Sequence, residues 1–269
     1  MKWSPEGKKK LQRVPFFIRR MVKKKVEEYA SENSIDVIGP EHLDLLKERF
    51  MKNQAQELKG YSVETCLGAD GCPNRNLPST DLADKLEHFL KTQGLKDFLL
   101  KRLDGKLKIH NEFRVSISFC PNSCSRPQIV DLGFIGAVVP VVKDSDSCDR
   151  CLACLKTCKE DAIILDERPE IDLKKCLYCG SCIKVCKRGV LAVEKTGFRC
   201  LVGGKLGRHP QLGHELPIIL SDEQAYEIAQ KVLFFFKANC KKGERLGTIL
   251  SQKGLASLYK AIDIPLREI

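Results

Sequence analysis

Cysteine is the residue type whose spacing in this sequence most clearly indicates chemistry. The 269 residues include 14 cysteines, and most of them fall into three groups. Two groups share the spacing C-x2-C-x2-C-x3-C, and the third joins a C-x5-C pair to a C-x3-C pair. The groups are Cys148, Cys151, Cys154 and Cys158; Cys176, Cys179, Cys182 and Cys186; and Cys66, Cys72, Cys120 and Cys124. The basic N-terminus lacks the apolar stretch of a secretory signal, so we expect these thiols to bind metal rather than to form disulfides.

The two runs of identical spacing predict two [4Fe–4S] clusters. Three closely spaced thiolates can wrap one face of a cubane, while the fourth cysteine of each run crosses to the other cluster. The predicted ligand sets are Cys148, Cys151, Cys154 and Cys186 for one cluster, and Cys176, Cys179, Cys182 and Cys158 for the other. Zinc usually takes its ligands as two separated pairs, so it fits these interlocked runs badly. With short β-like stretches at 162–165 and 189–193, residues 143–196 resemble a two-cluster bacterial ferredoxin, except that Lys159 and Lys187 replace the usual proline.

The third group of cysteines lies in two loops rich in glycine, proline and asparagine. Such loops leave backbone N–H groups free to face sulfide and thiolate. Four thiolates from two loops could hold a third cubane, but two separated cysteine pairs also suit zinc, and spacing alone leaves both open. Between the loops we predict a helix over 79–90, capped by Ser79 or Thr80, with Leu82, Leu86 and Phe89 on its inner face, and then a strand over 115–119.

Four motifs resemble the sirohaem-dependent sulfite and nitrite reductase family. They are the Cys-Pro-Asn-Ser-Cys loop at 120–124 and the glycine-containing stretches at 131–136, 203–208 and 243–247. The resemblance covers about 61–262 and is interrupted by the ferredoxin-like segment, as in the dissimilatory sulfite reductase branch. It implies a [4Fe–4S] cluster rather than zinc at Cys66, Cys72, Cys120 and Cys124. It further implies that Cys124 bridges to the sirohaem iron and that Asn122 and Arg126 contact this cofactor.

The activity implied by the resemblance is reduction of a small oxyanion, with sulfite favoured over nitrite. An external donor such as a ferredoxin would supply electrons through the two ferredoxin-type clusters. A carboxylate-rich haem and an anionic substrate require a cationic pocket. The predicted catalytic cations are Arg126, Arg208, Lys205, Lys108 and Arg114, with His110, His209 and His214 as weaker candidates. A multi-cluster electron-transfer protein, or a tetrapyrrole-related reductive protein with another substrate, is the alternative.

The N-terminal segment carries ten Lys and Arg residues within positions 1–25. Its apolar residues recur at helical spacing, which favours an amphipathic helix with a solvated basic face over a nucleic-acid-binding segment. These residues are Val14, Phe17, Ile18, Met21, Val22 and Val26. A second helix is predicted over 40–50, with Leu43, Leu46 and Phe50 inside. The strings at 3–6 and 14–20 resemble the small C-terminal domain of light-independent protochlorophyllide reductase.

The composition is typical of a globular protein, with 43% hydrophobic and 30% charged residues and a net charge of +11. No apolar run approaches the ~18 residues of a membrane span.

We predict an α+β fold divided into a helical domain at 1–56, a reductase-like module at 57–142 and 197–269, and an inserted ferredoxin domain at 143–196. A helix is expected over 222–238, with Ala225, Ile228, Val232 and Phe235 inside, and Cys200 and Cys240 are expected to be buried. Cluster chemistry favours a reducing cytoplasm, and the presence of one family repeat favours a homodimer or a second subunit that completes the site.

Overall fold

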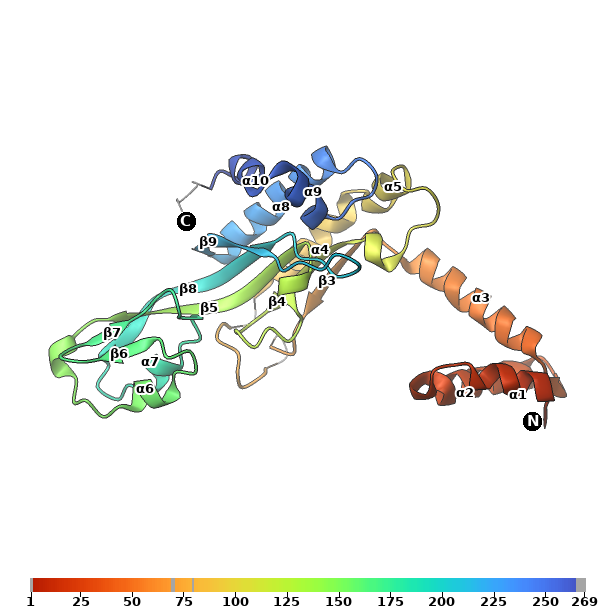
Figure 1. Ribbon diagram of the computed structural model, residues 1–269, viewed down its shortest axis with the longest axis horizontal. Helices are drawn as coiled ribbons and strands as arrows, with labels where there is room; N and C mark the ends of the chain where they lie inside the picture. Colours follow the sequence, from red (N-terminus) through yellow and green to blue (C-terminus); the bar gives the residue numbers. More distant parts are fainter. Residues whose placement is uncertain (1, 69–70, 79, 265–269) are drawn as a thin grey trace. The chain divides into compact units, whose positions relative to one another are not determined.

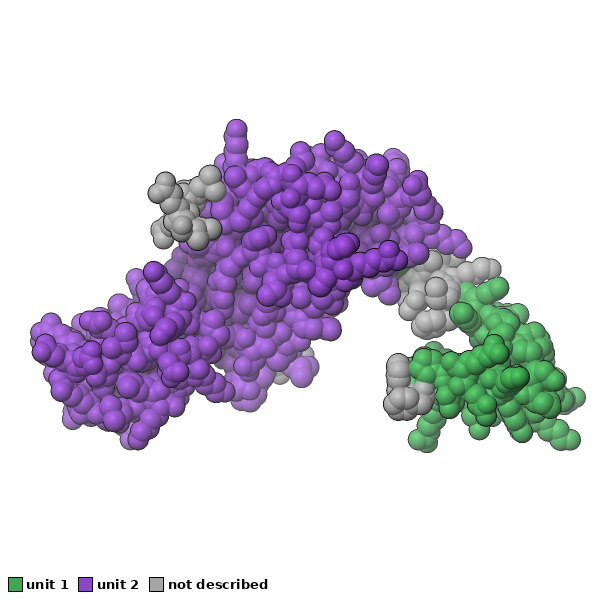
Figure 2. Space-filling view, in the orientation of Figure 1, with its two compact units in different colours: residues 1–58 green, residues 59–269 purple. Residues whose placement is uncertain are grey.

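The chain forms two compact units, residues 1–58 and 59–269 (Figures 1 and 2). The computed structural model describes residues 2–68, 71–78 and 80–264, without the side chains of residues 16, 17 and 50–57. Both units mix helices with strands, as the predicted α+β class requires. No helix in these ranges combines the length and apolar character needed to cross a lipid bilayer.

The N-terminal unit packs three helices around a small apolar core. Its elements are β1 (Lys2–Trp3), α1 (Pro5–Gln12), α2 (Phe16–Glu32), β2 (Val37–Ile38) and α3 (Pro40–Glu57), with β1 and β2 parallel. The buried residues are Leu11, Val26, Ala30, Ile38 and Leu43. Helix α1 begins where the Ser4 hydroxyl accepts a hydrogen bond from the Gly7 N–H at 3.0 Å, which satisfies one of the unpaired donors of the first turn.

Two predictions about this unit need correction. The expected single amphipathic helix is preceded by a separate helix, α1, and Met21 of α2 is 55% exposed rather than inside. Met21 faces outward because Val26 and Ala30 of the same helix face the core, and the helical period leaves Met21 outside that stripe. Phe17 and Phe50, which we expected to be buried, lie outside the side chains that the structure describes.

The second unit is built on a five-stranded mixed sheet with the strand order β3-β4-β5-β8-β9. The strands are β3 (Tyr61–Thr65), β4 (Phe113–Ser118), β5 (Leu132–Val142), β8 (Leu191–Val202) and β9 (His214–Leu220). Strands β3, β4 and β5 are parallel, whereas β5, β8 and β9 pair antiparallel. Parallel neighbours bring the ends of β3 and β4 to the same edge of the sheet, which decides where the following loops begin.

Helices cover one face of this sheet (Figure 1). They are α4 (Leu82–Thr92), α5 (Leu95–Leu100), α8 (Asp222–Asn239), α9 (Leu246–Lys253) and α10 (Leu255–Ile262). Phe113 of β4 packs its ring 5.2 Å from that of Phe236 on α8, so the odd-numbered residues of β4 face the helices. The even-numbered Ser116 and Ser118 instead hydrogen-bond to Ser125, which places the loop after β4 on the opposite face.

The helix predictions in this unit hold except at one terminus. The inner faces predicted for α4 and α8 are buried. Helix α4, however, begins at Leu82 with Asp81 in the cap position, and the Thr80 hydroxyl accepts only the Leu82 N–H at 3.4 Å. Ser79, the other predicted cap, lies outside the described residues. Helix α8 has a reciprocal cap in which the Ser221 hydroxyl accepts from the Gln224 N–H and the Gln224 side chain accepts from the Ser221 N–H.

The cysteine runs lie beyond the long β5–β8 hairpin, in the segment with α6 (Ala153–Thr157), β6 (Ile163–Leu165), β7 (Pro169–Ile171) and α7 (Ser181–Val185) (Figure 1). Strands β6 and β7 pair antiparallel. The β5–β8 ladder runs from Leu132↔Val202 to Val142↔Leu191, with a bulge at Val139 and Pro140. Strand β5 ends just before the expected start of the inserted domain at residue 143, whereas β8 begins at Leu191, before the expected end at residue 196. The division into three domains stays a prediction.

Candidate metal and cofactor site

The third cysteine group assembles at the carboxyl ends of two neighbouring parallel strands. Cys66 directly follows β3, and Cys120 lies two residues after β4. The Cys66 N–H donates to the Ile117 carbonyl at 3.0 Å, and the Phe119 N–H donates to the Cys66 sulfur at 3.4 Å. Cys72 and Cys124 follow in the two loops. The sheet thus brings together thiols that are more than fifty residues apart in the chain.

Burial and the other three thiols of this group affect the pKa of Cys120. Burial raises the pKa of Cys120, and the charges of Cys66, Cys124 and Cys72 raise it further, whereas the Asn122 backbone N–H lowers it. Gly68 also belongs to this arrangement, because a Cβ atom there would lie 2.7 Å from the Phe119 Cβ and 3.0 Å from the Cys66 sulfur. Four thiolates held this close repel one another, so all four can be ionised only if a cation compensates their charge.

The first ferredoxin-type ligand set surrounds a cavity of about 310 Å³. Its lining includes Cys148, Cys151, Cys154 and Cys186, so the fourth cysteine of the second run joins the first three of the first run. The Leu191 N–H donates to the Cys186 sulfur at 3.5 Å. Burial raises the pKa of Cys154, to which the charges of Cys148 and Cys151 also contribute.

The second ferredoxin-type set surrounds another cavity, of about 270 Å³. Its lining includes Cys158, Cys176, Cys179 and Cys182, and it also reaches Cys120 and Asn122 of the third cysteine group. Backbone N–H groups of Ala162 and Tyr178 donate to the sulfurs of Cys158 and Cys176 at 3.3 and 3.4 Å. Burial raises the pKa of Cys182 to about 11, and the neighbouring charges of Cys176 and Cys179 add to it.

The arrangement of the thiols fits polynuclear groups. Within residues 2–68, 71–78 and 80–264, no three Cys, His, Asp or Glu side chains converge on one point as ligands of a single ion do. The thiols of each ferredoxin-type set instead line the walls of a cavity, with N–H donors directed at sulfur. These are the donors and the space that an iron–sulfur cubane requires.

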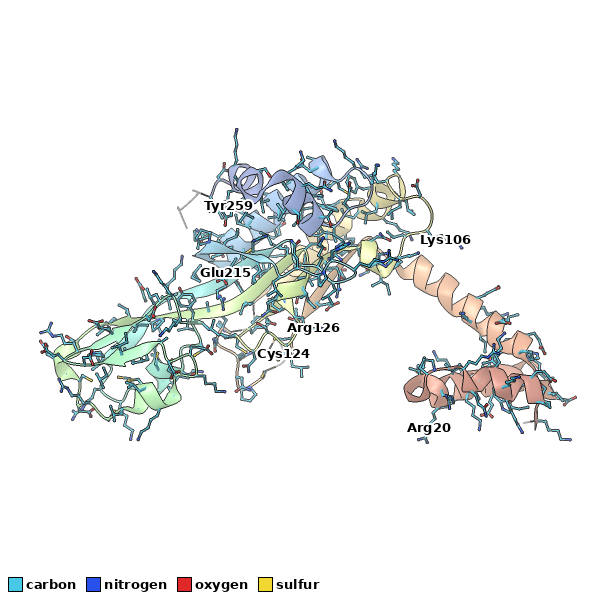
Figure 3. All side chains as sticks on the ribbon, in the orientation of Figure 1. Arg20, Lys106, Cys124, Arg126, Glu215 and Tyr259 are labelled. Carbon is cyan, nitrogen blue, oxygen red and sulfur yellow. The ribbon has the colours of Figure 1, made fainter. Side chains whose placement is uncertain are left out.

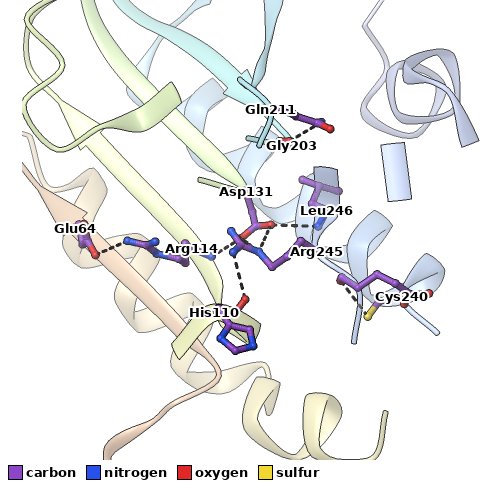
Figure 4. Close-up of polar contacts among 10 residues, drawn as sticks. Glu64, His110, Arg114, Asp131, Gly203, Gln211, Cys240, Arg245 and Leu246 are labelled. Atoms are coloured by element: carbon purple, nitrogen blue, oxygen red, sulfur yellow. Dashed lines mark hydrogen bonds and ion pairs between the residues drawn. The ribbon is translucent and has the colours of Figure 1, made fainter. Parts of the chain in front are cut away.

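A polar network joins the starts of β4 and β5 to the residues at the start of α9 (Figure 4). Asp131 is fully buried at the start of β5 and accepts hydrogen bonds from the Arg245 guanidinium at 2.6–3.1 Å and from the Arg114 and Leu246 N–H groups at 2.9 and 3.2 Å. The Arg114 guanidinium donates to Glu64 at 2.9 Å. Arg114 shares the face of β4 with Ser116 and Ser118, the face that carries the cysteine loop.

The predicted cations occupy different surroundings. Figure 3 places Cys124 and Arg126 on the same loop; both are exposed, and Arg126 has a left-handed backbone with φ 59°. Lys205 donates to the Thr248 hydroxyl at 2.9 Å, and Lys108 is an exposed residue beside a short 3-10 turn (Ile109–Asn111). Arg208 and His209 are exposed. Among the described residues, no hydrogen bond or ion pair joins the side chains of these candidate cations to one another.

His110 and His214 complete the predicted set. His110 contributes its carbonyl, which accepts from Arg245 at 3.3 Å, and its side chain is exposed. His214 begins the edge strand β9 and is exposed. Cys200 and Cys240 are buried as expected, and burial raises the pKa of both thiols.

Sequence reasoning missed two charged pairs. Asp131 and Arg245 both lie inside quoted motifs, but nothing in their spacing indicates that they meet. Arg199 of β8 and Glu215 of β9 form a second pair with two hydrogen bonds of 2.6 Å. A register shift between Arg199 and Leu201 sets their pairing, and a shift of that kind leaves no signal in the residue pattern.

Comparison with known proteins extends over most of the chain. Residues 60–269 match the family described as Nitrite and sulphite reductase 4Fe-4S domain, and residues 3–47 match Proto-chlorophyllide reductase 57 kD subunit. Over 200 residues the chain is 30% identical to the coenzyme F420-dependent sulfite reductase of Methanocaldococcus jannaschii, covering 73% of this chain and 30% of that protein. The crystal structure of dissimilatory sulfite reductase I has a similar fold, with a TM-score of 0.53 and 18% identity over 78% of this chain and 53% of that one. The chain thus spans less than a third of the curated relative.

Proposed function

Because the chain belongs to the nitrite and sulphite reductase 4Fe–4S domain family, we propose that it is a sirohaem- and [4Fe–4S]-dependent oxidoreductase that reduces sulfite. The observation that carries this proposal is the meeting of Cys66, Cys72, Cys120 and Cys124 at the ends of β3 and β4, with Cys124 exposed beside the exposed Arg126. Family membership supports an oxidoreductase with an iron–sulfur domain. The sirohaem, the substrate and the individual ligands are our proposal.

The cysteines would hold three [4Fe–4S] clusters. Cys66, Cys72, Cys120 and Cys124 form the site next to the haem, and Cys124 is suited to bridge because its thiol is exposed whereas Cys120 is buried. The bound sirohaem would supply an electron-rich iron that binds sulfite through sulfur. The protein contributes thiolates, N–H donors to sulfur, and the cations that neutralise the carboxylates of the macrocycle.

The cavities support an order of electron transfer. The cavity of Cys158, Cys176, Cys179 and Cys182 also contacts Cys120, whereas the cavity of Cys148, Cys151, Cys154 and Cys186 is separate. We therefore expect an external low-potential donor, such as a ferredoxin, to reduce the latter site first. Cys151 and Leu152 are exposed at that site, which leaves it accessible to the donor.

Arg126 is the strongest candidate to bind the anions. Arg126 is exposed two residues after Cys124, and within the described part of the chain its guanidinium makes no hydrogen bond or ion pair. The Arg114 guanidinium is already paired with Glu64, and the Arg114 backbone N–H donates to Asp131. Arg208 and His209 are exposed in the loop after β8, where they could face the macrocycle, whereas Lys205 is engaged with Thr248. A partner chain, most simply a second copy, would complete this pocket. We place the protein in a reducing cytoplasm.

An absorption spectrum with an iron count on anaerobically purified protein tests the proposal. Three cubanes and one sirohaem correspond to about 13 iron atoms per chain. We expect a red-shifted isobacteriochlorin band that changes when sulfite is added to the reduced protein. About 12 iron atoms without such a band would instead support a multi-cluster electron-transfer subunit, the reading that the ferredoxin-type segment favours. A band that responds to nitrite and not to sulfite would change the substrate.

A further inference from the structure

Arg199 of β8 and Glu215 of β9 form a closely bonded ion pair. The Arg199 Nε and Nη2 atoms each donate to a Glu215 carboxylate oxygen at 2.6 Å. The Arg199 side chain is only 13% exposed, and that of Glu215 is 38% exposed. Figure 3 labels Glu215, which lies in β9. Because Arg199 is largely excluded from water, its charge is less screened than that of a surface arginine.

The strand order gives this pair a direction relative to the loop that carries Cys176. Arg199 lies on β8, the direct neighbour of β5, and Glu215 lies on β9, one strand farther away. The cysteine loop bonds to Val138 of β5. The cation is therefore one strand closer to the cysteine loop than the carboxylate is.

The loop that carries Cys176 is fixed against the same part of the sheet. The Tyr178 carbonyl accepts the Val138 N–H of β5 at 2.8 Å and the Asn76 amide at 3.5 Å. The backbone of Cys179 also forms an isolated parallel β-bridge with Val138. Arg199 is the β8 partner of Ile135, three residues before Val138 in β5. Backbone hydrogen bonds thus hold both Arg199 and the cysteine loop on one strand.

We propose that Arg199, held in place by Glu215, is a positioning residue that raises the reduction potential of the cluster bound by Cys158, Cys176, Cys179 and Cys182. Reduction adds one electron and one negative charge at this site, and no bond or proton is transferred. The electron leaves the cluster of Cys148, Cys151, Cys154 and Cys186, which an external one-electron donor reduces again. A fixed cation stabilises the additional negative charge, whereas the Glu215 carboxylate partly opposes it.

This arrangement uses two properties of arginine. A guanidinium binds a carboxylate through two parallel hydrogen bonds and stays charged at every physiological pH, so the cation is both oriented and permanent. The expected consequence is a thermodynamically favourable electron transfer from the other ferredoxin-type cluster to the cluster in the cavity that Cys120 also lines. The inference rests on the proposed function only in that these four cysteines bind a cluster; it depends neither on the sirohaem nor on the substrate.

A redox titration followed by electron paramagnetic resonance tests this role in the full-length, iron-loaded chain. Arg199→Gln should lower one of the midpoint potentials by about 59 mV, which is a tenfold change in the equilibrium of a one-electron step. Glu215→Gln should raise that same midpoint, because it removes the opposing charge and leaves the arginine. Arg199→Lys, which keeps the charge, should stay within a factor of three of the wild-type equilibrium.

Arg188→Gln is the matched control. Arg188 pairs with Asp149 at 3.3 Å beside the other cavity, and its side chain is 64% exposed. Solvent screens this pair, so the midpoint that responds to Arg199→Gln should not move.

The proposal is overturned if Arg199→Gln and Glu215→Gln shift the midpoint in the same direction, or if both change the equilibrium less than twofold at full iron content. If Arg199→Gln fails to retain iron, the shift in Glu215→Gln decides, and an unchanged or lowered midpoint there overturns the proposal. A chain without sirohaem or sulfite turnover that still shows the opposite shifts would overturn the reductase function and leave this inference standing.

Discussion

At the scale of single residues, buried thiols and buried carboxylates have different roles in this protein. Cys120 is buried in the third cysteine group, whereas Cys200 is buried within strand β8, opposite Phe134 of β5. Asp131 is also buried, but its carboxylate is paired with the Arg245 guanidinium and accepts hydrogen bonds from neighbouring backbone N–H groups. Burial alone therefore does not identify a ligand, and the neighbours of each residue decide its role.

Replacing Cys120 should remove one cluster. We expect Cys120→Ser to lower the iron content by about four atoms per chain, because a cubane needs all four thiolates of its site. The matched variant Cys200→Ala should keep the full iron content. Iron and acid-labile sulfide assays on anaerobic protein measure both. Full iron in Cys120→Ser would exclude this cysteine as a ligand.

Replacing Asp131 should destabilise the sheet. Asp131→Asn leaves the largely buried Arg245 guanidinium without its counter-charge, and breaking such a pair costs about 3–5 kcal/mol. Glu64→Gln removes the partly exposed partner of Arg114 and should cost at most about 1 kcal/mol. Urea unfolding with an unchanged m-value measures the difference. Equal losses in the two variants would contradict the role of Asp131.

At the scale of elements, close backbone contacts join motifs that are distant in the chain. Helix α9 packs against the end of β8 at Gly247, where a Cβ atom would lie 2.1 Å from the Gly203 carbonyl oxygen. The Gln211 amide donates to the carbonyls of both Gly203 and Gly247, at 2.9 and 3.3 Å. The glycines of two quoted motifs are therefore required by one packing contact.

Gly247→Ala should lower stability despite a favourable helix propensity. Alanine gains up to about 1 kcal/mol over glycine within a helix, but the clash with the Gly203 carbonyl forces α9 away and costs about 1–3 kcal/mol. Gln252→Ala, at an exposed position of the same helix, should change the unfolding free energy by less than about 0.5 kcal/mol. A Gly247→Ala variant as stable as the wild type in thermal unfolding would contradict this prediction, because it would show that α9 can move away from Gly203 without loss of stability.

At the scale of the whole molecule, the distribution of exposed polar groups indicates an incomplete pocket. Cys124 and Arg126 are exposed on the cysteine-loop face of the sheet, while the helices cover the other face. The described residues of the second unit, 59–269, would enclose an anionic macrocycle bound there on one side only. This is the physical reason for proposing that a second chain contributes.

The cofactor-loaded protein should therefore form a dimer. Light scattering coupled to gel filtration should give about twice the 30.3 kDa of one chain, and the dimer should persist at sub-micromolar concentration if the partner closes the pocket. A loaded protein that remains a monomer at all concentrations would contradict this prediction.

The sequence by itself predicted the grouping of the cysteines and determined the main helices. Short, repeated spacings define which thiols can reach one cluster, and helical periodicity correctly predicted the inner faces of α4 and α8, because both signals depend only on neighbouring residues. Tertiary structure decided the rest. Cys66 and Cys120 meet because β3 and β4 are parallel neighbours, Arg245 reaches Asp131 across the fold, and a register shift pairs Arg199 with Glu215. Contacts over such separations depend on strand order and register, which local residue patterns do not encode.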